Sequence, residues 1–202
     1  MFTGLIREFA RVVRYENNYL ELASSLKPKI GDSIAINGVC LTVIAIKDGN
    51  FQVELSAETR AIMAVENLRD FVHVEPAMRL DERLEGHIVQ GHIDTIGVIK
   101  SIEKNENASD FYISIKPEFE KFIVPKGSIA IDGVSLTVNS VNKAEFRLTI
   151  ISHTLAQTLF SSYKIGRKVN IETDMFARYI YHMFGRKQKL DWASVDKMMA
   201  LY

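Results

Sequence analysis

Short runs in which apolar and polar residues alternate recur along the whole chain, and this period of two is typical of strands with one buried face. Clusters of lysine, glycine, aspartate and asparagine separate the runs, as turns require. The pattern predicts two sets of six strands. The first set is 4–13, 19–23, 33–36, 40–46, 51–55 and 71–75, and the second is 95–102, 111–115, 128–131, 135–141, 146–151 and 168–172.

The two sets are related by an internal repeat. Residues 33–59 align with residues 128–154 without a gap, at an offset of 95 positions, and 11 of the 27 aligned positions are identical. Further on the offset becomes 97, where residues 72–75 (VHVE) align with residues 169–172 (VNIE). Chance would give only a few identities over such a window, so the chain contains a duplicated domain.

Turn and helix signals complete the picture of each copy. Asn37-Gly38 and Asp132-Gly133 stand between two apolar runs, which favours a type I′ hairpin. Residues 58–68 and 154–163 change to a period near 3.6, which predicts one short helix before the last strand of each copy. Because closure removes exposed strand edges, we expect an all-β fold with two tandem, similar, six-stranded antiparallel barrels of Greek-key-like order.

The segments outside the repeat suggest the domain boundaries. Residues 78–85 (MRLDERLE) are charged and lack a strand pattern, so we predict barrels at 1–85 and 86–174 and a helical segment at 175–202. Asp174 is a suitable N-cap and Gly185 a suitable end for the helix. Its apolar stripe either packs back on the barrels or meets the same helix in other subunits. The stripe consists of Met175, Phe176, Tyr179, Ile180, Met183 and Phe184.

Composition restricts the partners and the compartment. Lys+Arg and Asp+Glu both number 25, so no net charge attracts nucleic acid or an anionic membrane. The N-terminus (MFTGLIREFA) carries charge where a signal peptide is apolar, and no run of about 18 apolar residues occurs. Cys40 is the single cysteine, so an intrachain disulfide or a CxxC motif is impossible. We therefore expect a cytoplasmic protein with no nucleic acid and no membrane as partner.

Several motifs together resemble the riboflavin synthase family. They are MFTG at the N-terminus, NGVCLTV, SAET, GHIVQGHID, DGVSLTV, the Ile-Ser-His-Thr-Leu run at 151–155, and VNIETD. The resemblance covers nearly the whole chain. The sequence departs from the family at Glu85, where a glycine is usual, and at Ser152, where a proline is frequent.

The resemblance implies an activity and an assembly. The family converts two molecules of 6,7-dimethyl-8-ribityllumazine into riboflavin and a ribitylaminopyrimidine, without a cofactor. It implies that each barrel holds one substrate, and that a C-terminal helix assembles a homotrimer. The active site then forms where the N-terminal barrel of one subunit faces the C-terminal barrel of a neighbour. Association with lumazine synthase is a further partnership that the resemblance suggests.

The family's motif positions also imply site residues in this sequence. The implied catalytic residues are Phe2, Ser33, Cys40, His92 and Asp174. The implied substrate-binding residues are Gly4, Leu5, Ile6, Cys40, Leu41, Thr42, Glu54, Leu55, Ser56, Ala57, Glu58, Thr59, Gly91, His92, Ile93, Lys126, Ser135, Leu136, Thr137, Ile151, Ser152, His153, Thr154, Leu155 and Ala156.

The residue types fit this chemistry, although each has a structural alternative. Hydroxyls that recur in register in both copies suit two like ligands with ribityl chains, whereas a single strand threonine can serve β propensity alone. Cys40 is a weak nucleophile as a thiol, and the alternative is a small strand residue; its partner in the second copy is Ser135. His92 suits acid–base chemistry near neutral pH or a structural role.

Three further candidates have equally plain alternatives. Phe2 either covers a bound ring or plugs the end of a barrel. Lys126 either reaches a ligand across a subunit interface or faces solvent. His87, His92 and Asp94 lack the supporting cluster that a metal site needs, so we predict no metal ligands.

Two other protein classes compete with a synthase. Lumazine and flavin antenna proteins of luminous bacteria share the duplicated fold but keep one competent site, whereas here both copies retain the hydroxyl-bearing motif. A flavin-binding reductase barrel is disfavoured, because the sequence has neither an Arg-x-Tyr-Ser motif nor a Gly-rich strand–helix turn.

Overall fold

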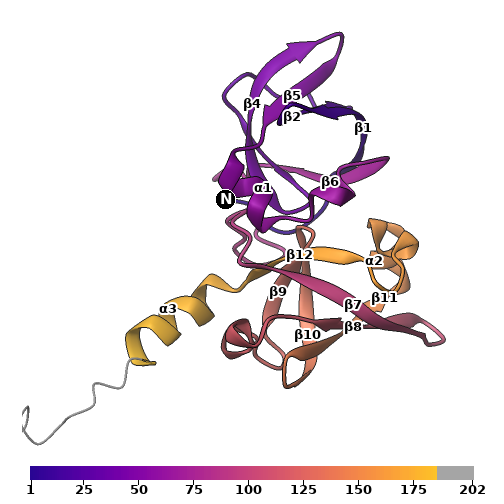
Figure 1. Cartoon of the computed structure of the whole chain (residues 1–202), viewed down its shortest axis with the longest axis vertical. Helices are drawn as coiled ribbons and strands as arrows, with labels where there is room; N and C mark the ends of the chain where they lie inside the picture. The colour runs from indigo at the N-terminus through magenta and orange to yellow at the C-terminus, as the bar shows by residue number, and fades with distance from the viewer. Residues whose placement is uncertain (186–202) are drawn as a thin grey trace, which may run out of the picture.

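Twelve strands form two closed barrels that lie one after the other along the chain (Figure 1). The computed structural model describes residues 1–185. The first barrel contains β1 (Glu8–Glu16), β2 (Tyr19–Ala23), β3 (Ser33–Ile36), β4 (Val39–Lys47), β5 (Asn50–Glu54) and β6 (Phe71–Pro76). The second contains β7 (Thr95–Lys104), β8 (Ala108–Ser114), β9 (Ser128–Ile131), β10 (Val134–Asn142), β11 (Glu145–Ile151) and β12 (Lys168–Thr173).

The strand order is the same in the two barrels, which confirms the fold predicted from the repeat. The first barrel runs β1-β2-β5-β4-β3-β6, and β6 pairs with β1 to close it. The second runs β7-β8-β11-β10-β9-β12, with β12 closing on β7. Every pairing is antiparallel, and each barrel encloses its own core of aliphatic and phenylalanine side chains. The predicted strands are all present, with ends that differ by a few residues.

The start of β1 is the largest difference from the predicted strands. The alternation suggested a strand from residue 4, but β1 begins at Glu8. Before it, Phe2 forms an isolated antiparallel bridge with Val89, outside either barrel. Ile6 then packs against the core of the second barrel, while Ile93 packs in the core of the first. The leading segment of each copy therefore lies on the other copy's barrel.

The two predicted hairpins are type I′ turns, and they meet between the barrels. Asn37 and Gly38 have φ of 45° and 81°, and Asp132 and Gly133 have 45° and 83°. A Cβ added to Gly38 would lie 2.6 Å from the backbone nitrogen of Gly133. No side chain fits between the two turns, so both positions need glycine for a close backbone approach as well as for positive φ.

The two predicted helices are each broken in the middle. Residues 58–68 form α1 (Ala57–Ile62) and the 3₁₀ turn η1 (Val65–Asn67), and residues 154–163 form α2 (Ser152–Ala156) and η3 (Leu159–Ser162). The N–H of Ala64 donates to Asn170 Oδ1, and the N–H of Leu159 donates to His73 Nε2, each at 2.7 Å. These backbone donors bond to the opposite barrel instead of continuing a helix.

A buried polar network therefore joins the barrels, with two equivalent halves. The Asn170 side chain donates to the carbonyl of Asn37, and His73 Nδ1 lies 2.9 Å from the carbonyl of Asp132. Because His73 Nε2 accepts the N–H of Leu159, Nδ1 carries the proton and donates. Burial lowers the pKa of His73 to about 4, so the ring is neutral at physiological pH.

Two helical elements lie outside the duplicated pattern. The 3₁₀ helix η2 (Pro117–Phe122) was not predicted, because its proline, two glutamates and one lysine resemble a polar loop. The tail helix α3 (Met175–Phe184) has Asp174 as its N-cap, whose side chain accepts the N–H of Phe176, and Gly185 as its C-cap, as the sequence predicts. Residues 186–202 of the predicted helical segment lie outside the described residues. Figure 1 shows α3 extending outward from the end of β12, and its Tyr181 packs on Phe122 of η2. Within residues 1–185, no helix is long and apolar enough to cross a membrane.

Candidate functional site

The outer face of β3 and β4 brings together three of the predicted residues of the first barrel. In the β3–β4 register, Ser33 is opposite Thr42 and Ala35 is opposite Cys40. Opposed residues of an antiparallel pair share a face, and the intervening Ile34 and Leu41 point into the core. Ser33, Cys40 and Thr42 therefore line one patch on the outside of the barrel, which we call the first face. The interior of the barrel is filled by core side chains, so any polar surface of this barrel is on its outer wall.

The segment that carries His92 lies beside the first face. The N–H of Cys40 donates to the carbonyl of Gly91 at 2.9 Å. A Cβ on Gly91, which has φ of 82°, would lie 2.5 Å from the Cβ of Cys40, so a side chain cannot fit here. His92 follows with an exposed side chain, and Ile93 enters the core of the first barrel. The predicted residues 91–93 are thus next to Cys40.

A buried carboxylate from the second barrel holds this segment in place. Glu172 accepts the backbone N–H groups of Gln90, Gly91 and His92 at 2.7–2.9 Å. Burial raises the pKa of Glu172, and the three hydrogen bonds work in the opposite direction by stabilising the charged form. The position of His92 beside the first barrel therefore depends on strand β12 of the second.

Helix α3 is attached to the same segment. Arg178 donates to Asp94 Oδ1 at 2.8 Å and to Gln90 Oε1 at 2.7 Å. The other oxygen of Asp94 accepts the N–H and the hydroxyl of Thr173, at the end of β12. Asp174, the next residue, caps α3 and is half-buried. The predicted catalytic residue Asp174 thus sits at the junction of β12 and α3.

The second barrel has an equivalent outer face. Ser128 is opposite Thr137 and Ala130 is opposite Ser135 in the β9–β10 register. We call Ser128, Ser135 and Thr137 the second face. The N–H of Ser135 donates to the carbonyl of Gly4 at 2.8 Å, as Cys40 does to Gly91. Sequence reasoning missed Ser128, although it aligns with Ser33 in the repeat and that identity could have identified it.

Glu75 holds the segment beside the second face, just as Glu172 holds the segment beside the first. It accepts the N–H and the hydroxyl of Thr3 at 2.7 Å and the N–H of Gly4 at 3.1 Å. Burial raises the pKa of Glu75. The predicted binding residues Leu5 and Ile6 follow and are half-buried. Leu136, also predicted, packs against the second core, as Leu41 packs in the first.

The loop after β5 and its counterpart after β11 carry the remaining predicted binding residues. Ser56 caps α1 by accepting the N–H of Thr59, and the two hydroxyls lie 2.9 Å apart. Glu54, Ala57 and Glu58 are exposed, whereas Leu55 is a core residue that offers a ligand only its backbone. In the second copy, Ile151, Ser152, His153 and Ala156 are exposed, and Thr154 and Leu155 are half-buried.

Of the last two predicted residues, Phe2 lies where its predicted roles need revision, whereas the exposed position of Lys126 agrees with either of its alternatives. Phe2 is fully buried between the barrels, against Ala35, Val89 and Ala130. It neither plugs a barrel nor has exposed surface with which to cover a ligand; it packs beneath the first face instead. Lys126 is exposed, with φ of 64°, and its N–H donates to the carbonyl of Val138.

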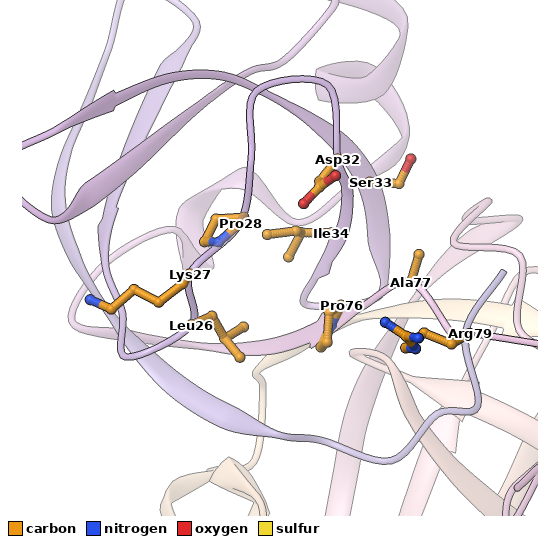
Figure 2. A pocket seen from close by; sticks show the side chains of 9 residues that line it. All are labelled: Leu26, Lys27, Pro28, Asp32, Ser33, Ile34, Pro76, Ala77 and Arg79. Carbon is orange, nitrogen blue, oxygen red and sulfur yellow. The ribbon is translucent and has the colours of Figure 1, made fainter. Parts of the chain in front are cut away.

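Ser33 also borders a separate pocket of about 440 Å³ at the end of the first barrel (Figure 2). Lys27 and Arg79 lie on opposite sides of it, and Leu26, Pro28 and Pro76 line its apolar part. The corresponding part of the second barrel is where β12 continues into α3, which packs on η2 through Phe122 and Tyr181. The pocket is thus the place where the first barrel lacks a terminal helix.

Comparison with known proteins agrees with this architecture. The lumazine binding domain model matches residues 3–77 and 90–174. Riboflavin synthase from Photobacterium phosphoreum is 39% identical over 193 residues, which cover 89% of this chain and 87% of that protein. Riboflavin synthase from Bacillus subtilis (strain 168) is 37% identical over 190 residues, which cover 90% of this chain and 88% of that protein.

A solved structure shares the fold at lower sequence identity. The crystal structure of LumP complexed with riboflavin superposes with a TM-score of 0.77 at 19% identity, covering 86% of this chain and 99% of that chain. A structure of LumP complexed with 6,7-dimethyl-8-(1'-D-ribityl) lumazine gives a TM-score of 0.74 at 17% identity. The domain model matches both halves of the chain, and the relatives align with most of its length. The chain therefore belongs to the riboflavin synthase family.

Proposed function

We propose that the chain is a riboflavin synthase. It catalyses the dismutation of two molecules of 6,7-dimethyl-8-ribityllumazine by transfer of a four-carbon unit. The products are riboflavin and 5-amino-6-ribitylamino-2,4(1H,3H)-pyrimidinedione. The observation that carries the proposal is the pair of outer faces, Ser33–Cys40–Thr42 and Ser128–Ser135–Thr137, in the same register on two like barrels. Two equivalent polar faces suit a reaction whose two substrates are the same molecule.

Each face offers what one lumazine requires. The flat ring has donor and acceptor edges, and backbone groups at strand ends bind such edges without special side chains. The ribityl chain needs hydroxyl and carboxylate partners, which Thr42, Ser56 and Glu58 supply in the first copy. In the second copy, Thr137 and Thr154 supply hydroxyls. This assignment follows the predicted binding residues, with Ser128 added to the second face.

The chemistry requires few catalytic groups once two rings are held together. The acceptor lumazine loses a proton from its acidic 7-methyl group and becomes a delocalised carbanion. The donor is attacked at its own C7 by water or by a side chain such as Cys40. The exposed His92, next to Cys40, takes part in acid–base chemistry. Orientation of the rings contributes about 7–11 kcal/mol to lowering the barrier.

The two rings meet between subunits, in a homotrimer that α3 assembles. Phe176, Tyr179, Ile180, Met183 and Phe184 are each more than half exposed. An apolar surface of this kind marks an interface. A shared site also agrees with the fold, because each barrel carries its own face. The free thiol of Cys40 fits a cytoplasmic location, where cysteines stay reduced.

The test of function is incubation of the purified protein with 6,7-dimethyl-8-ribityllumazine, without added metal, flavin or nucleotide. We expect one riboflavin for every two lumazines consumed. Exhaustive chelation should not change the rate; a loss that a divalent ion restores would contradict metal-free catalysis. Tight binding of fluorescent lumazine without turnover would instead indicate a binding protein of the antenna type.

The test of assembly is best made by substitution on α3. Removing the chain after Asp174 would also remove Arg178, which holds Asp94 and Gln90 beside the first face. Ile180→Lys with Met183→Lys leaves Arg178 in place and puts charge on the apolar surface. We expect folded monomers by light scattering that bind lumazine but barely turn over, because the rings must meet by diffusion. A folded monomer with near-native turnover would contradict the shared site.

A further inference from the structure

One histidine outside the predicted site contacts the second face directly. His87 Nδ1 lies 2.7 Å from the Oγ of Ser135, the residue that aligns with Cys40 in the repeat. The N–H of His87 donates to the carbonyl of Thr3, so the backbone of the histidine is fixed by the segment beside that face. Ser135 therefore has a side-chain partner that depends on the contact between the two copies.

The first face has no equivalent of this pair. The backbone of Gly91 lies against Cys40. The Sγ of Cys40 has no hydrogen-bond partner within residues 1–185. Ser135 is approached by two glycines, Gly4 and Gly86, and a Cβ added to Gly86 would lie 3.2 Å from Ser135 Oγ. Gly86 thus brings the backbone close enough for His87 to reach the hydroxyl.

The electrostatic surroundings of His87 keep its ring neutral. Burial lowers its pKa, and the charge of Asp174 acts in the opposite direction. A neutral imidazole has one donor nitrogen and one acceptor nitrogen, so it accepts from the Ser135 hydroxyl or donates to it. Within the described residues, Nε2 is buried without a hydrogen-bond partner. The contact with Ser135 Oγ is therefore the one side-chain hydrogen bond of the His87 ring within residues 1–185.

We propose that His87 is a positioning residue for catalysis: it fixes the position of the Ser135 Oγ at the second face. The proposal rests on the proposed function, because it assigns Ser135 to a bound lumazine. An unpaired serine side chain samples several staggered rotamers, whereas one whose Oγ is paired with a ring nitrogen keeps that oxygen in one position, whichever of the two atoms donates. The two faces then differ in more than the replacement of sulfur by oxygen. The hydroxyl of Ser135 is held in one position, whereas the thiol of Cys40 is not.

A double-mutant cycle tests the pair. His87→Leu removes the partner of the hydroxyl, and we expect kcat to fall about tenfold while the lumazine Kd changes less than about twofold. In the Ser135→Ala background the hydroxyl is already absent, so His87→Leu should then have no further effect. His87→Asn places an amide near the position of Nδ1 and should restore most of kcat. Glu85→Gln, an exposed change in the same segment, is the matched control and should match the parent.

The outcomes separate this inference from the proposed function. If the unsubstituted protein consumes no lumazine, the proposed function fails and the assignment of His87 fails with it. If the protein is active and His87→Leu is equally active, only the positioning role is wrong. An equal loss from His87→Leu with and without the Ser135→Ala substitution would also overturn it, because the effect would then come from folding. Thermal unfolding of each variant shows whether a loss of activity comes from a loss of folding. His87→Asn provides a second variant if His87→Leu does not fold.

Discussion

The two barrels are built on one plan, and several of the positions where they differ lie at the contact between them and on their outer faces. At the contact, the first copy has Asn37 and His73 where the second has Asp132 and Asn170. On the faces, the first has Cys40 and the second has Ser135 with its partner His87. The strand order and the paired glycines are the same in both. Duplication has thus kept the framework while the polar residues that join the barrels, or face a ligand, have diverged.

The shared part of the plan should be the most sensitive to substitution. Gly38→Ala would put a Cβ 2.6 Å from the nitrogen of Gly133, at a φ of 81°. We expect the free energy of unfolding to fall by about 3 kcal/mol or more, since backbone strain and overpacking add. Gly133→Ala should cost a similar amount, because the two turns face each other. Urea denaturation measures both.

Gly49→Ala separates the two causes. Gly49 has φ of 82°, but a Cβ there meets nothing within 4 Å. Its substitution should therefore cost only the strain of the left-handed conformation, about 1–2 kcal/mol. If the alanine substitutions at Gly38 and Gly49 lowered the free energy of unfolding equally, the close contact between the two turns would add nothing to the effect of backbone strain.

The buried network should give the next largest effect, through its response to pH. His73 has a folded pKa of about 4, below the ordinary 6.5, so the unfolded chain binds its proton more readily between these values. His73 therefore makes stability rise as pH increases from 4 to 6.5. Asp132 has a folded pKa of about 6, raised by burial from 3.8, so it makes stability fall as pH increases from 3.8 to 6. The two contributions oppose each other.

Substitutions that introduce the other copy's residue should separate these contributions. The difference in unfolding free energy between the parent and His73→Asn should rise with pH, by at most about 1.4 kcal/mol per unit between pH 4 and 6.5. For Asp132→Asn the same difference should fall with pH between 4 and 6. Urea titrations of the three proteins at each pH measure both. A pH-independent difference for either variant would exclude a contribution from that residue.

Exchange of the outer-face residues should affect turnover more than binding. Cys40→Ser makes the first face resemble the second, yet the new hydroxyl has no histidine beside it. We expect kcat to fall about tenfold, roughly 1.4 kcal/mol, with the lumazine Kd within about twofold. Stopped-flow single turnovers measure the chemical step directly. Unchanged single-turnover rates would show that the thiol serves packing alone.

The sequence contains most of the fold but only part of the site, and the reason is physical. Strand periodicity and the Asn-Gly and Asp-Gly dipeptides are local signals, so the strands and both type I′ turns were predictable. The helix breaks were not, because they arise when Ala64 and Leu159 donate to side chains 106 and 86 residues away in the other barrel. Contacts of that kind leave no trace in a local pattern.

The site shows the same division. Cys40 and Thr42 could be placed on one strand face from alternation alone. The burial of Phe2 and the pairing of His87 with Ser135 depend on how the leading segment of each copy crosses to the other barrel. Ser128 could have been predicted, since the repeat aligns it with Ser33. Knowledge of the repeat therefore gives equivalent positions, and only the structure gives the partners that make them unequal.

The smallest expected difference concerns the start of the short helices, where the first copy has a cap that the second lacks. Ser56 caps α1 through the N–H of Thr59, whereas the aligned Ile151 gives α2 no side-chain cap. Both residues have extended backbones, with φ and ψ of −62° and 162° for Ser56 and −71° and 157° for Ile151. A serine at position 151 should therefore accept the N–H of Thr154.

We expect Ile151→Ser to raise the free energy of unfolding by about 0.5–1 kcal/mol, because an N-cap hydroxyl replaces a side chain that cannot cap. Ile151 is 56% exposed, so removal of its apolar surface offsets only part of this gain. Ile151→Ala is the matched control, since it removes the same surface without adding a cap. Ser56→Ala should lower stability by about 1 kcal/mol in the first copy. Urea denaturation measures the free energy of unfolding of each variant. Equal values for the serine and alanine variants at position 151 would mean that a side chain at this position does not cap α2, although Ser56 caps α1.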